Sequence, residues 1–223
     1  MNIGRAFTYM FEDESWFTKM LILVFLFIFM FFLIPLPIIA GYLLAVAANV
    51  MRGDNRLPSW DRIGQYFVDG LKFLVALFVY LIPIIIIAGL LGLTVGGGAK
   101  AFSTTPGPAW GRGLSPTMLL IQFLVWLYSA FVGPALAVLF LKTGGNFAQL
   151  FNIGRFFSII TTCLGGLIMV LLVSMGLGFV LSIIAGILML IPCLGWLLTL
   201  FLAVYPSLVM GHLYGQLART CPA

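Results

Sequence analysis

Charged side chains are scarce in this chain: only 8% of its 223 residues are Asp, Glu, Lys or Arg, whereas 63% are hydrophobic. Soluble domains usually carry about 25% charged residues, so the composition excludes a soluble globular protein. The charge-free stretches are long and cover residues 20–51, 73–99, 113–141 and 156–218. Each exceeds the roughly 20 apolar residues with which a helix crosses the hydrocarbon core of a bilayer. We therefore expect an all-α fold, a polytopic helical bundle in a membrane.

Residues that support metal or nucleophilic chemistry are also few. The chain has one histidine, His212, and three cysteines, Cys163, Cys193 and Cys221. They form neither a CxxC pair nor a converging set of ligands, so neither a zinc site nor a disulfide framework is indicated. We interpret the cysteines as small apolar residues and His212 as a hydrogen-bonding side chain near a helix end. We expect no cofactor and no enzymatic activity.

The basic residues predict the number of crossings and their orientation. The stretch 20–51 is too long for one upright helix and short for two, and its midpoint holds Pro35 and Pro37, where a helix would kink or reverse. If this stretch crosses the membrane once, the basic residues divide seven to four between the two sides. If it forms a hairpin, nine basic residues lie on one side and only Lys100 and Arg112 on the other. The second division fits the positive-inside rule better. We predict six membrane segments in the inner (plasma) membrane, with both termini cytoplasmic.

A short repeat supports the hairpin. Ile3-Gly4 recurs as Ile63-Gly64 and as Ile153-Gly154, each time just before an apolar stretch. The chain thus resembles three pseudo-repeated hairpins, each preceded by a cytoplasmic amphipathic helix at the membrane interface. We treat residues 1–223 as a single integral membrane domain with repeat units of about 1–58, 59–145 and 146–223. A segment rich in Gly, Ser, Thr and Pro predicts an irregular outer loop at residues 94–114.

Small residues recur at every fourth position of the fifth membrane segment and predict a helix-packing face. They are Ser174, Gly178, Ser182 and Gly186. Gly211 and Gly215 in the last helix are candidates for the facing surface. Such a face serves packing within one chain or between chains, and we favour packing within the chain because six helices must pack together.

All six acidic residues lie in the first 72 positions, interleaved with basic ones. One interpretation is a docking surface or a site for a cation or a lipid headgroup. We favour the other, a set of exposed ion pairs worth about 0–1 kcal/mol each, because the two signs alternate. The candidate cytoplasmic surface comprises Asp54, Trp60, Asp61, Arg62, Asp69 and Lys72.

Several motifs carry a family resemblance. They are Phe11-Glu12-Asp13-Glu14-Ser15-Trp16, Gly41-Tyr42-Leu43-Leu44, Arg52-Gly53-Asp54, Leu57-Pro58-Ser59-Trp60-Asp61, Phe67-Val68-Asp69-Gly70-Leu71-Lys72, Gly195-Trp196-Leu197-Leu198 and Tyr214-Gly215. In these segments the chain resembles a family of uncharacterised bacterial and archaeal membrane proteins, domain of unknown function 4013. The resemblance implies a multi-pass membrane protein and no assigned activity.

The leading functional hypothesis is a non-enzymatic integral membrane protein that acts as a structural or accessory subunit of a membrane assembly. Its expected partners are membrane lipids and other membrane subunits or further copies of itself, and not nucleic acid, because the basic residues flank the apolar stretches. The alternative is a small transporter, channel or lipid-handling protein. Transport predicts that the few polar residues of the membrane segments converge on one cavity; these are Asn49, Gln122, Tyr128, Ser129 and Tyr205. An enzyme ranks third and would require the cytoplasmic acids to gather around a cleft.

Overall fold

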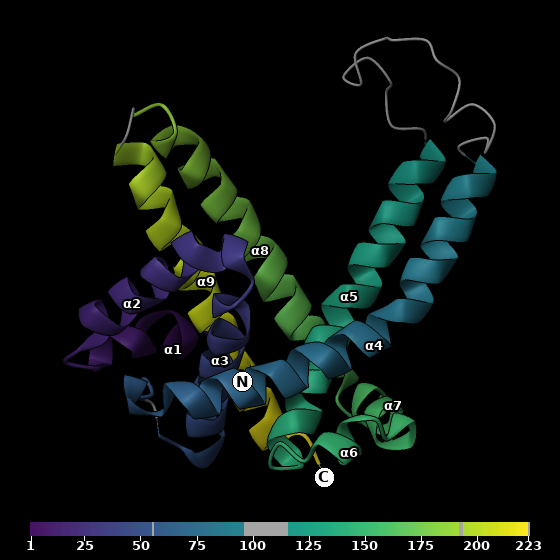
Figure 1. Cartoon of the computed structure of the whole chain (residues 1–223), viewed down its shortest axis with the longest axis horizontal. Helices are drawn as coiled ribbons and strands as arrows, with labels where there is room; N and C mark the ends of the chain where they lie inside the picture. The colour runs from purple at the N-terminus through teal and green to yellow at the C-terminus, as the bar shows by residue number, and fades with distance from the viewer. Residues whose placement is uncertain (55, 96–115, 192–193, 223) are drawn as a thin grey trace. The chain divides into compact units, whose positions relative to one another are not determined.

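The computed structural model describes residues 1–54, 56–95, 116–191 and 194–222, and in these ranges every regular element is a helix. Figure 1 labels the α-helices. In chain order the elements are α1 (Ile3–Thr8), η1 (Tyr9–Glu12), α2 (Trp16–Ile28), η2 (Phe29–Phe32), α3 (Pro35–Arg52), η3 (Trp60–Arg62), α4 (Ile63–Val95), α5 (Pro116–Lys142), α6 (Phe147–Leu150), α7 (Ile153–Thr162), α8 (Leu164–Leu188) and α9 (Leu194–Thr220). The expected outer loop at 94–114 lies almost wholly outside the described residues.

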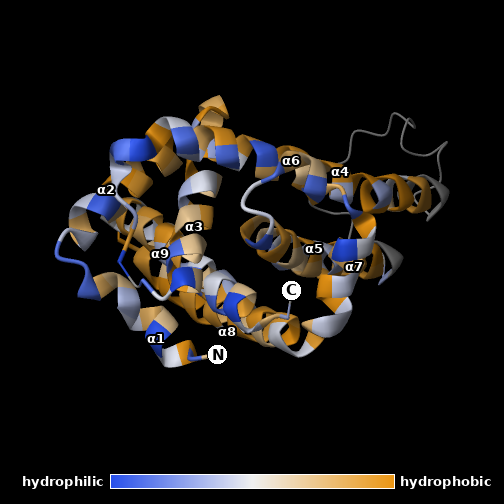
Figure 2. Ribbon diagram, turned by 90° about the horizontal axis from the view of Figure 1, so that it is seen from below, coloured by the Kyte–Doolittle hydropathy of each residue, from blue (hydrophilic) through white to orange (hydrophobic). Residues whose placement is uncertain are grey.

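Five of the described helical segments are long and apolar enough to cross a membrane. They are Pro35–Arg52, Trp60–Leu91, Leu119–Lys142, Leu164–Leu188 and Leu197–Thr220. A sixth is added if Ile3–Glu12 and Trp16–Phe32, which are bent by 101° relative to each other, form one broken span. Hydrophobic colour dominates the helices in Figure 2. The all-helical fold with five to six apolar helices is confirmed, while the three repeated hairpins stay a prediction.

The chain divides into two compact units. One comprises Met1–Ala76 and Pro134–Ala223, and the other comprises Leu77–Gly133. The second unit holds the later part of α4 and the earlier part of α5, and within it the hydroxyl of Tyr128 donates to the carbonyl of Tyr80 at 2.9 Å. The first unit holds all the other helices, the remaining parts of α4 and α5, and the main cluster of buried hydrophobic residues.

The first apolar stretch reverses between α2 and α3. Leu33, two residues before Pro35, adopts a left-handed backbone conformation with φ 59°. Pro35 then occupies the first turn of α3, where its missing N–H removes no helical hydrogen bond. The reversal that the proline pair predicts therefore lies just ahead of Pro35. α3 ends at Gly53, whose φ of 88° lets the following amide of Asp54 donate back to the carbonyl of Asn49.

Two of the three Ile-Gly segments begin with the same cap. The side-chain oxygen of Asn2 accepts from the amide of Arg5 at 3.1 Å, and that of Asn152 accepts from the amide of Arg155 at 3.0 Å. Each asparagine satisfies an amide that has no partner in the first helical turn. The third Ile-Gly segment begins α4, which runs on without a break, so the second expected interfacial helix is the first part of α4.

Two glycines let α3 and α4 cross in contact. A Cβ added at Gly41 would collide with the carbonyl oxygen of Tyr66, and one added at Gly70 would collide with the carbonyl oxygen of Pro37. The contacts run antiparallel, one helical turn apart on each helix. Backbone can approach backbone this closely only where a side chain is missing.

The core of the first unit forms where α3 and α9 pack together and α1, η1 and α2 cover them. A Cβ at Gly215 would collide with the carbonyl oxygen of Ala47, and one at Gly211 would lie 3.3 Å from that of Leu43. The two ends of the chain are joined as well: the Asn2 amide donates to the side-chain oxygen of Gln216 at 2.6 Å, and the Gln216 side-chain amide donates to the Asn2 carbonyl at 2.9 Å.

The structure corrects the interpretation of the cysteines. Cys163, between α7 and α8, forms a disulfide with Cys221, which follows α9. Their Cα atoms are 5.6 Å apart, a separation that a disulfide spans without backbone movement. The side chain of Lys142 donates to the carbonyl of Cys221 at 2.7 Å and fixes the same end of the chain. These two cysteines are therefore a structural pair rather than isolated apolar residues.

The glycine crossing generates a stability prediction. Replacing Gly70 by Ala places a methyl group against the backbone of Pro37, and we expect it to lower the free energy of unfolding in detergent by about 3 kcal/mol. Gly64→Ala is the matched control in the same helix, because an added Cβ there has no described atom within 4 Å. Denaturant titration of both variants checks this, and equal stabilities would contradict the close crossing.

Candidate functional site

A buried carboxylate organises the turn between η1 and α2. Asp13 is only 7% exposed. One of its oxygens accepts from the amide and the hydroxyl of Ser15, at 2.9 and 2.8 Å. The other accepts from the ammonium of Lys19 at 2.7 Å and from the amide of Leu57 at 3.1 Å. Lys19 also donates to the carbonyl of Leu57 at 2.9 Å, so the ion pair holds both polar backbone groups of one residue in the connection between α3 and α4.

The hydrogen bonds also decide the protonation of Asp13. Burial raises the pKa of a carboxyl group, but the hydrogen bonds from Lys19 and Ser15 outweigh burial and hold the pKa of Asp13 below its ordinary value. The carboxylate is therefore charged at neutral pH, and its charge is paired. This corrects the expectation that the acids of the first 72 residues are exposed: Asp13 is buried, and its ion pair with Lys19 is partly buried.

Three aromatic rings fix the other end of the same connection. Tyr42 of α3 stacks on Trp60 with ring centroids 4.2 Å apart and planes 7° apart, and Tyr66 meets both rings edge-on. The Tyr42 hydroxyl donates to the carbonyl of Pro58 at 3.2 Å, and the Tyr66 hydroxyl donates to the carbonyl of Ser59 at 2.6 Å. The Asp13 carboxylate thus holds the connection at Leu57, and the two tyrosine hydroxyls hold it at Pro58 and Ser59.

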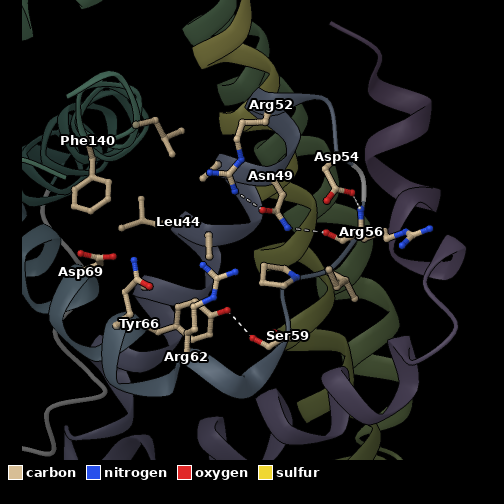
Figure 3. Close-up of a pocket in the computed structure, with 17 residues that line it drawn as sticks. Leu44, Asn49, Arg52, Asp54, Arg56, Ser59, Arg62, Tyr66, Asp69 and Phe140 are labelled. Atoms are coloured by element: carbon tan, nitrogen blue, oxygen red, sulfur yellow. Dashed lines mark hydrogen bonds between the residues drawn. The ribbon is translucent and has the colours of Figure 1, made fainter. Parts of the chain in front are cut away.

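This arrangement forms one wall of a polar cavity of about 430 Å³. The C-terminal half of α3, the connection and the first turns of α4 supply most of its lining, and Phe140 and Leu141 of α5 complete it (Figure 3). The lining is mixed. Leu44, Ala45 and Phe140 are apolar, whereas the charged and amide side chains are those of Asn49, Arg52, Asp54, Arg62, Gln65 and Asp69. Arg56 borders the cavity through its backbone, whose carbonyl accepts from the Asn49 side chain.

The charges of the cavity do not all have partners there. Figure 3 shows Arg52 and Arg62 reaching into it from different walls, while the side chain of Arg56 points outward. The Arg52 guanidinium donates to the side-chain oxygen of Asn49 at 2.7 Å. Asp54 accepts from the backbone amide of Arg56 at 3.0 Å, and Asp69 lies 3.6 Å from the ammonium of Lys72.

The predicted cytoplasmic surface is therefore only partly one site. Asp54, Arg62 and Asp69 line the cavity. Lys72 pairs with Asp69 beside it, and Trp60 is half-buried under the connection, with its ring nitrogen free of a hydrogen-bond partner within the described chain. Asp61 is exposed and does not line the cavity.

Sequence reasoning missed Asp13, Tyr42, Tyr66 and Asn49 as parts of one arrangement. The available signal was the set of motifs that carries the family resemblance. Asp13 belongs to the first motif, Tyr42 to the second and Leu57 to the fourth, and the structure joins them.

The two sets of small residues that were predicted to face each other contact different parts of the structure. Gly211 and Gly215 contact α3, as described above. Ser174, Gly178 and Ser182 instead line an apolar groove of about 520 Å³ between α8 and α9, with Ala203 and Ser207 on its α9 side and Phe27 of α2 alongside. Gly186 is exposed and lies outside the residues that line the groove.

Four of the five polar residues proposed for a transport path form hydrogen bonds to groups outside this set of five. Asn49 holds Arg52 and donates to the carbonyl of Arg56 at 3.1 Å. Ser129 donates to a carbonyl of its own helix at 2.8 Å, and the Tyr205 hydroxyl donates to the carbonyl of Phe7 at 3.1 Å. Tyr128 bonds to Tyr80, and Gln122 is exposed. None of these hydrogen bonds joins two of the five residues.

His212 lies in the buried core of the first unit. It is 1% exposed, and its ring packs against that of Tyr9 with ring centroids 4.3 Å apart and planes tilted by 36°. The side-chain amide of Gln216 lies 3.1 Å from its Nδ1 atom, so Nδ1 is the acceptor and Nε2 carries the proton. Among the described residues, no group of three or more His, Cys, Asp and Glu side chains is arranged to hold a metal ion.

A family model described as "Protein of unknown function (DUF4013)" matches residues 22–190. The chain belongs to this family. Every residue that lines the polar cavity falls inside the DUF4013 match, whereas Asp13 and Lys19 lie just before it. No curated protein and no solved structure matches the chain.

The buried carboxylate generates a pH prediction. Because folding lowers the pKa of Asp13, its contribution to stability is present above the pKa of the unfolded chain and is lost as the pH falls through the folded pKa. We expect the denaturant concentration at the unfolding midpoint of the wild-type protein in detergent to decrease once the pH is lowered below about 4. At neutral pH, Asp13→Asn should cost about 3 kcal/mol, because it leaves Lys19 without its counter-ion.

The exposed neighbour Glu14 provides the control. Glu14→Gln should follow the wild-type curve of midpoint against pH. Asp13→Asn should give a flatter curve that meets the wild-type curve in acid. Parallel curves for the wild type and Asp13→Asn would show that this carboxylate does not stabilise the fold.

Proposed function

We propose that this DUF4013 protein is a non-enzymatic integral membrane protein that acts as an accessory subunit of a membrane assembly. In this proposal the α8–α9 groove receives a transmembrane helix of another subunit or of a second copy of the chain. The cytoplasmic ends of the helices form the rigid base from which that face is presented.

The observation that carries the proposal is the groove itself. It lies along two candidate membrane spans, and its walls include Gly178 and Ser182 on one side and Ala203 and Ser207 on the other. In lipid there is no hydrophobic drive for helices to associate, so association depends on close van der Waals packing, which small residues permit. In an 18-residue apolar stretch of Leu164–Leu188 only 17% is buried by the chain itself, compared with 50% in Pro35–Arg52 and 11% in Trp60–Leu91. α8 therefore has surface available for another helix.

The local pairing of the polar membrane residues supports a subunit over a transporter. A transport path needs polar groups that face a common passage, whereas the hydroxyls of Tyr128, Ser129 and Tyr205 each donate to a nearby backbone carbonyl. Such bonds satisfy a hydroxyl inside the bilayer and leave it no free hydrogen to donate to a passing solute.

We also propose the orientation given by the basic residues, with both termini in the cytoplasm. The polar cavity and the Asp13 ion pair then lie on the cytoplasmic side, in the same unit as the chain ends. The membrane of residence in this proposal is the inner (plasma) membrane.

The subunit proposal is tested by gentle detergent extraction of the native protein, followed by mass spectrometry of what co-purifies. We expect a stoichiometric membrane partner or a homo-oligomer. Gly178→Leu fills the groove, and overpacking of about 1–3 kcal/mol should reduce the co-purified partner roughly tenfold. Gly176→Leu is the matched control, because Gly176 is exposed on α8 but does not line the groove.

A monomer that carries no stoichiometric protein would contradict the proposal. A monomer that retains bound lipid in the groove, lost in Gly178→Leu but not in Gly176→Leu, would favour the lipid-handling alternative instead.

The orientation has a separate test. In a cysteine-free background, a single cysteine at Arg62 should resist an impermeant thiol reagent added to intact cells and react after the membrane is opened. Labelling from outside in intact cells would reverse the proposed topology.

A further inference from the structure

We propose that the polar cavity between α3 and α4 binds a phosphate group, held by the guanidinium groups of Arg52 and Arg62. The inference does not depend on the subunit role, because it concerns the ends of α3 and α4 and not the α8–α9 groove. The same chemistry fits the headgroup phosphate of an anionic lipid and a soluble phosphate, and the experiment below separates the two sources.

The first support is the charge that the cavity leaves unpaired. Arg52 and Arg62 both reach into it (Figure 3). Neither guanidinium has a carboxylate within 4.0 Å in the described part of the chain, where the ion pairs are Arg5–Glu12, Lys19–Asp13 and Lys72–Asp69. Two like charges that share a cavity repel each other, and an anion between them converts that repulsion into two attractions.

The second support is that the two acidic side chains lining the cavity have partners other than the arginines. Asp69 lies beside Lys72, and Asp54 accepts a backbone amide of its own loop. Both acids line the cavity but have partners other than Arg52 and Arg62, so the guanidinium donors of these two arginines stay available to an anion.

The third support is the positioning of Arg52. Its Nη2 atom donates to Asn49, whose side-chain amide is itself held by the carbonyl of Arg56 at 3.1 Å. This leaves the remaining N–H groups of Arg52 for a ligand. A guanidinium offers paired donors that match the oxygen atoms of a phosphate, and one that is fixed in advance loses less entropy on binding.

The fourth support is the location and size of the cavity. It lies where the candidate spans Pro35–Arg52 and Trp60–Leu91 meet their polar connection, which is the depth at which headgroup phosphates lie. Its volume of about 430 Å³ admits a group larger than phosphate alone. Leu44, Ala45 and Phe140 supply an apolar wall that suits the glycerol and the first acyl carbons of a lipid.

The test uses the full-length protein purified in maltoside detergent, which contains no phosphate. One arm titrates short-chain phosphatidylglycerol against short-chain phosphatidylcholine, and the other titrates inorganic phosphate against chloride at equal ionic strength; calorimetry gives the dissociation constant in each. Arg52→Gln and Arg62→Gln should each weaken binding about tenfold. Arg56→Gln is the matched control, because this arginine lies in the same connection and points away from the cavity; its affinity should stay within about twofold of wild type.

Binding of phosphatidylglycerol alone, with this pattern of variants, identifies a lipid headgroup as the source. The same pattern with inorganic phosphate identifies soluble phosphate. If the glutamine variants aggregate, Arg52→Lys and Arg62→Lys keep the charge and lose only the paired donors, so they should bind less tightly than wild type. Binding in neither arm, lysine variants with wild-type affinity, or an equal loss in Arg56→Gln would each overturn the proposal.

Discussion

The buried carboxylate of Asp13 is the constraint on which the first unit depends. A charge removed from water is tolerated only where opposite charge and hydrogen bonds replace its hydration. Asp13 obtains these from Ser15, from Lys19 and from the backbone of Leu57, 44 residues away. The connection after α3 is thereby fixed against the turn before α2. On either side of this connection, Tyr42 of α3 stacks on Trp60, and α3 crosses α4 in close contact at Gly41 and Gly70.

The polar ends of α3 and α4 differ from α8 in how much of each the chain itself holds or covers. At the polar ends of α3 and α4, each residue from Leu57 to Ser59 has its carbonyl bound by a side chain, and the cavity beside them has preformed walls. Along α8 the chain makes few such bonds, and small residues line a groove beside α9. A polar site held by side chains and a little-covered apolar face both fit the proposed role of an accessory subunit that packs against another helix.

The sequence determined the class of fold more fully than the site. Long apolar stretches predict membrane helices because the bilayer requires them, and the proline pair marks the reversal at Leu33. Alternating charges did not reveal that Asp13 is buried, because its decisive partner is a backbone amide far along the chain. The four-residue spacing of Gly211 and Gly215 predicts a close approach but does not specify which helix approaches. Cys163 and Cys221 are 58 residues apart, and only the tertiary fold brings them together.

The most direct test of the central claim is amide hydrogen exchange in the connection between α3 and α4. The amide of Leu57 should be protected in the wild-type protein at neutral pH, because it donates to the Asp13 carboxylate. In Asp13→Asn the peptide that contains Leu57, Ser59 and Trp60 should exchange about tenfold faster, since loss of even one charge-assisted hydrogen bond is worth at least that factor. It should be unchanged in Glu14→Gln. Equal protection of this peptide in wild type and Asp13→Asn would show that the carboxylate does not hold the connection.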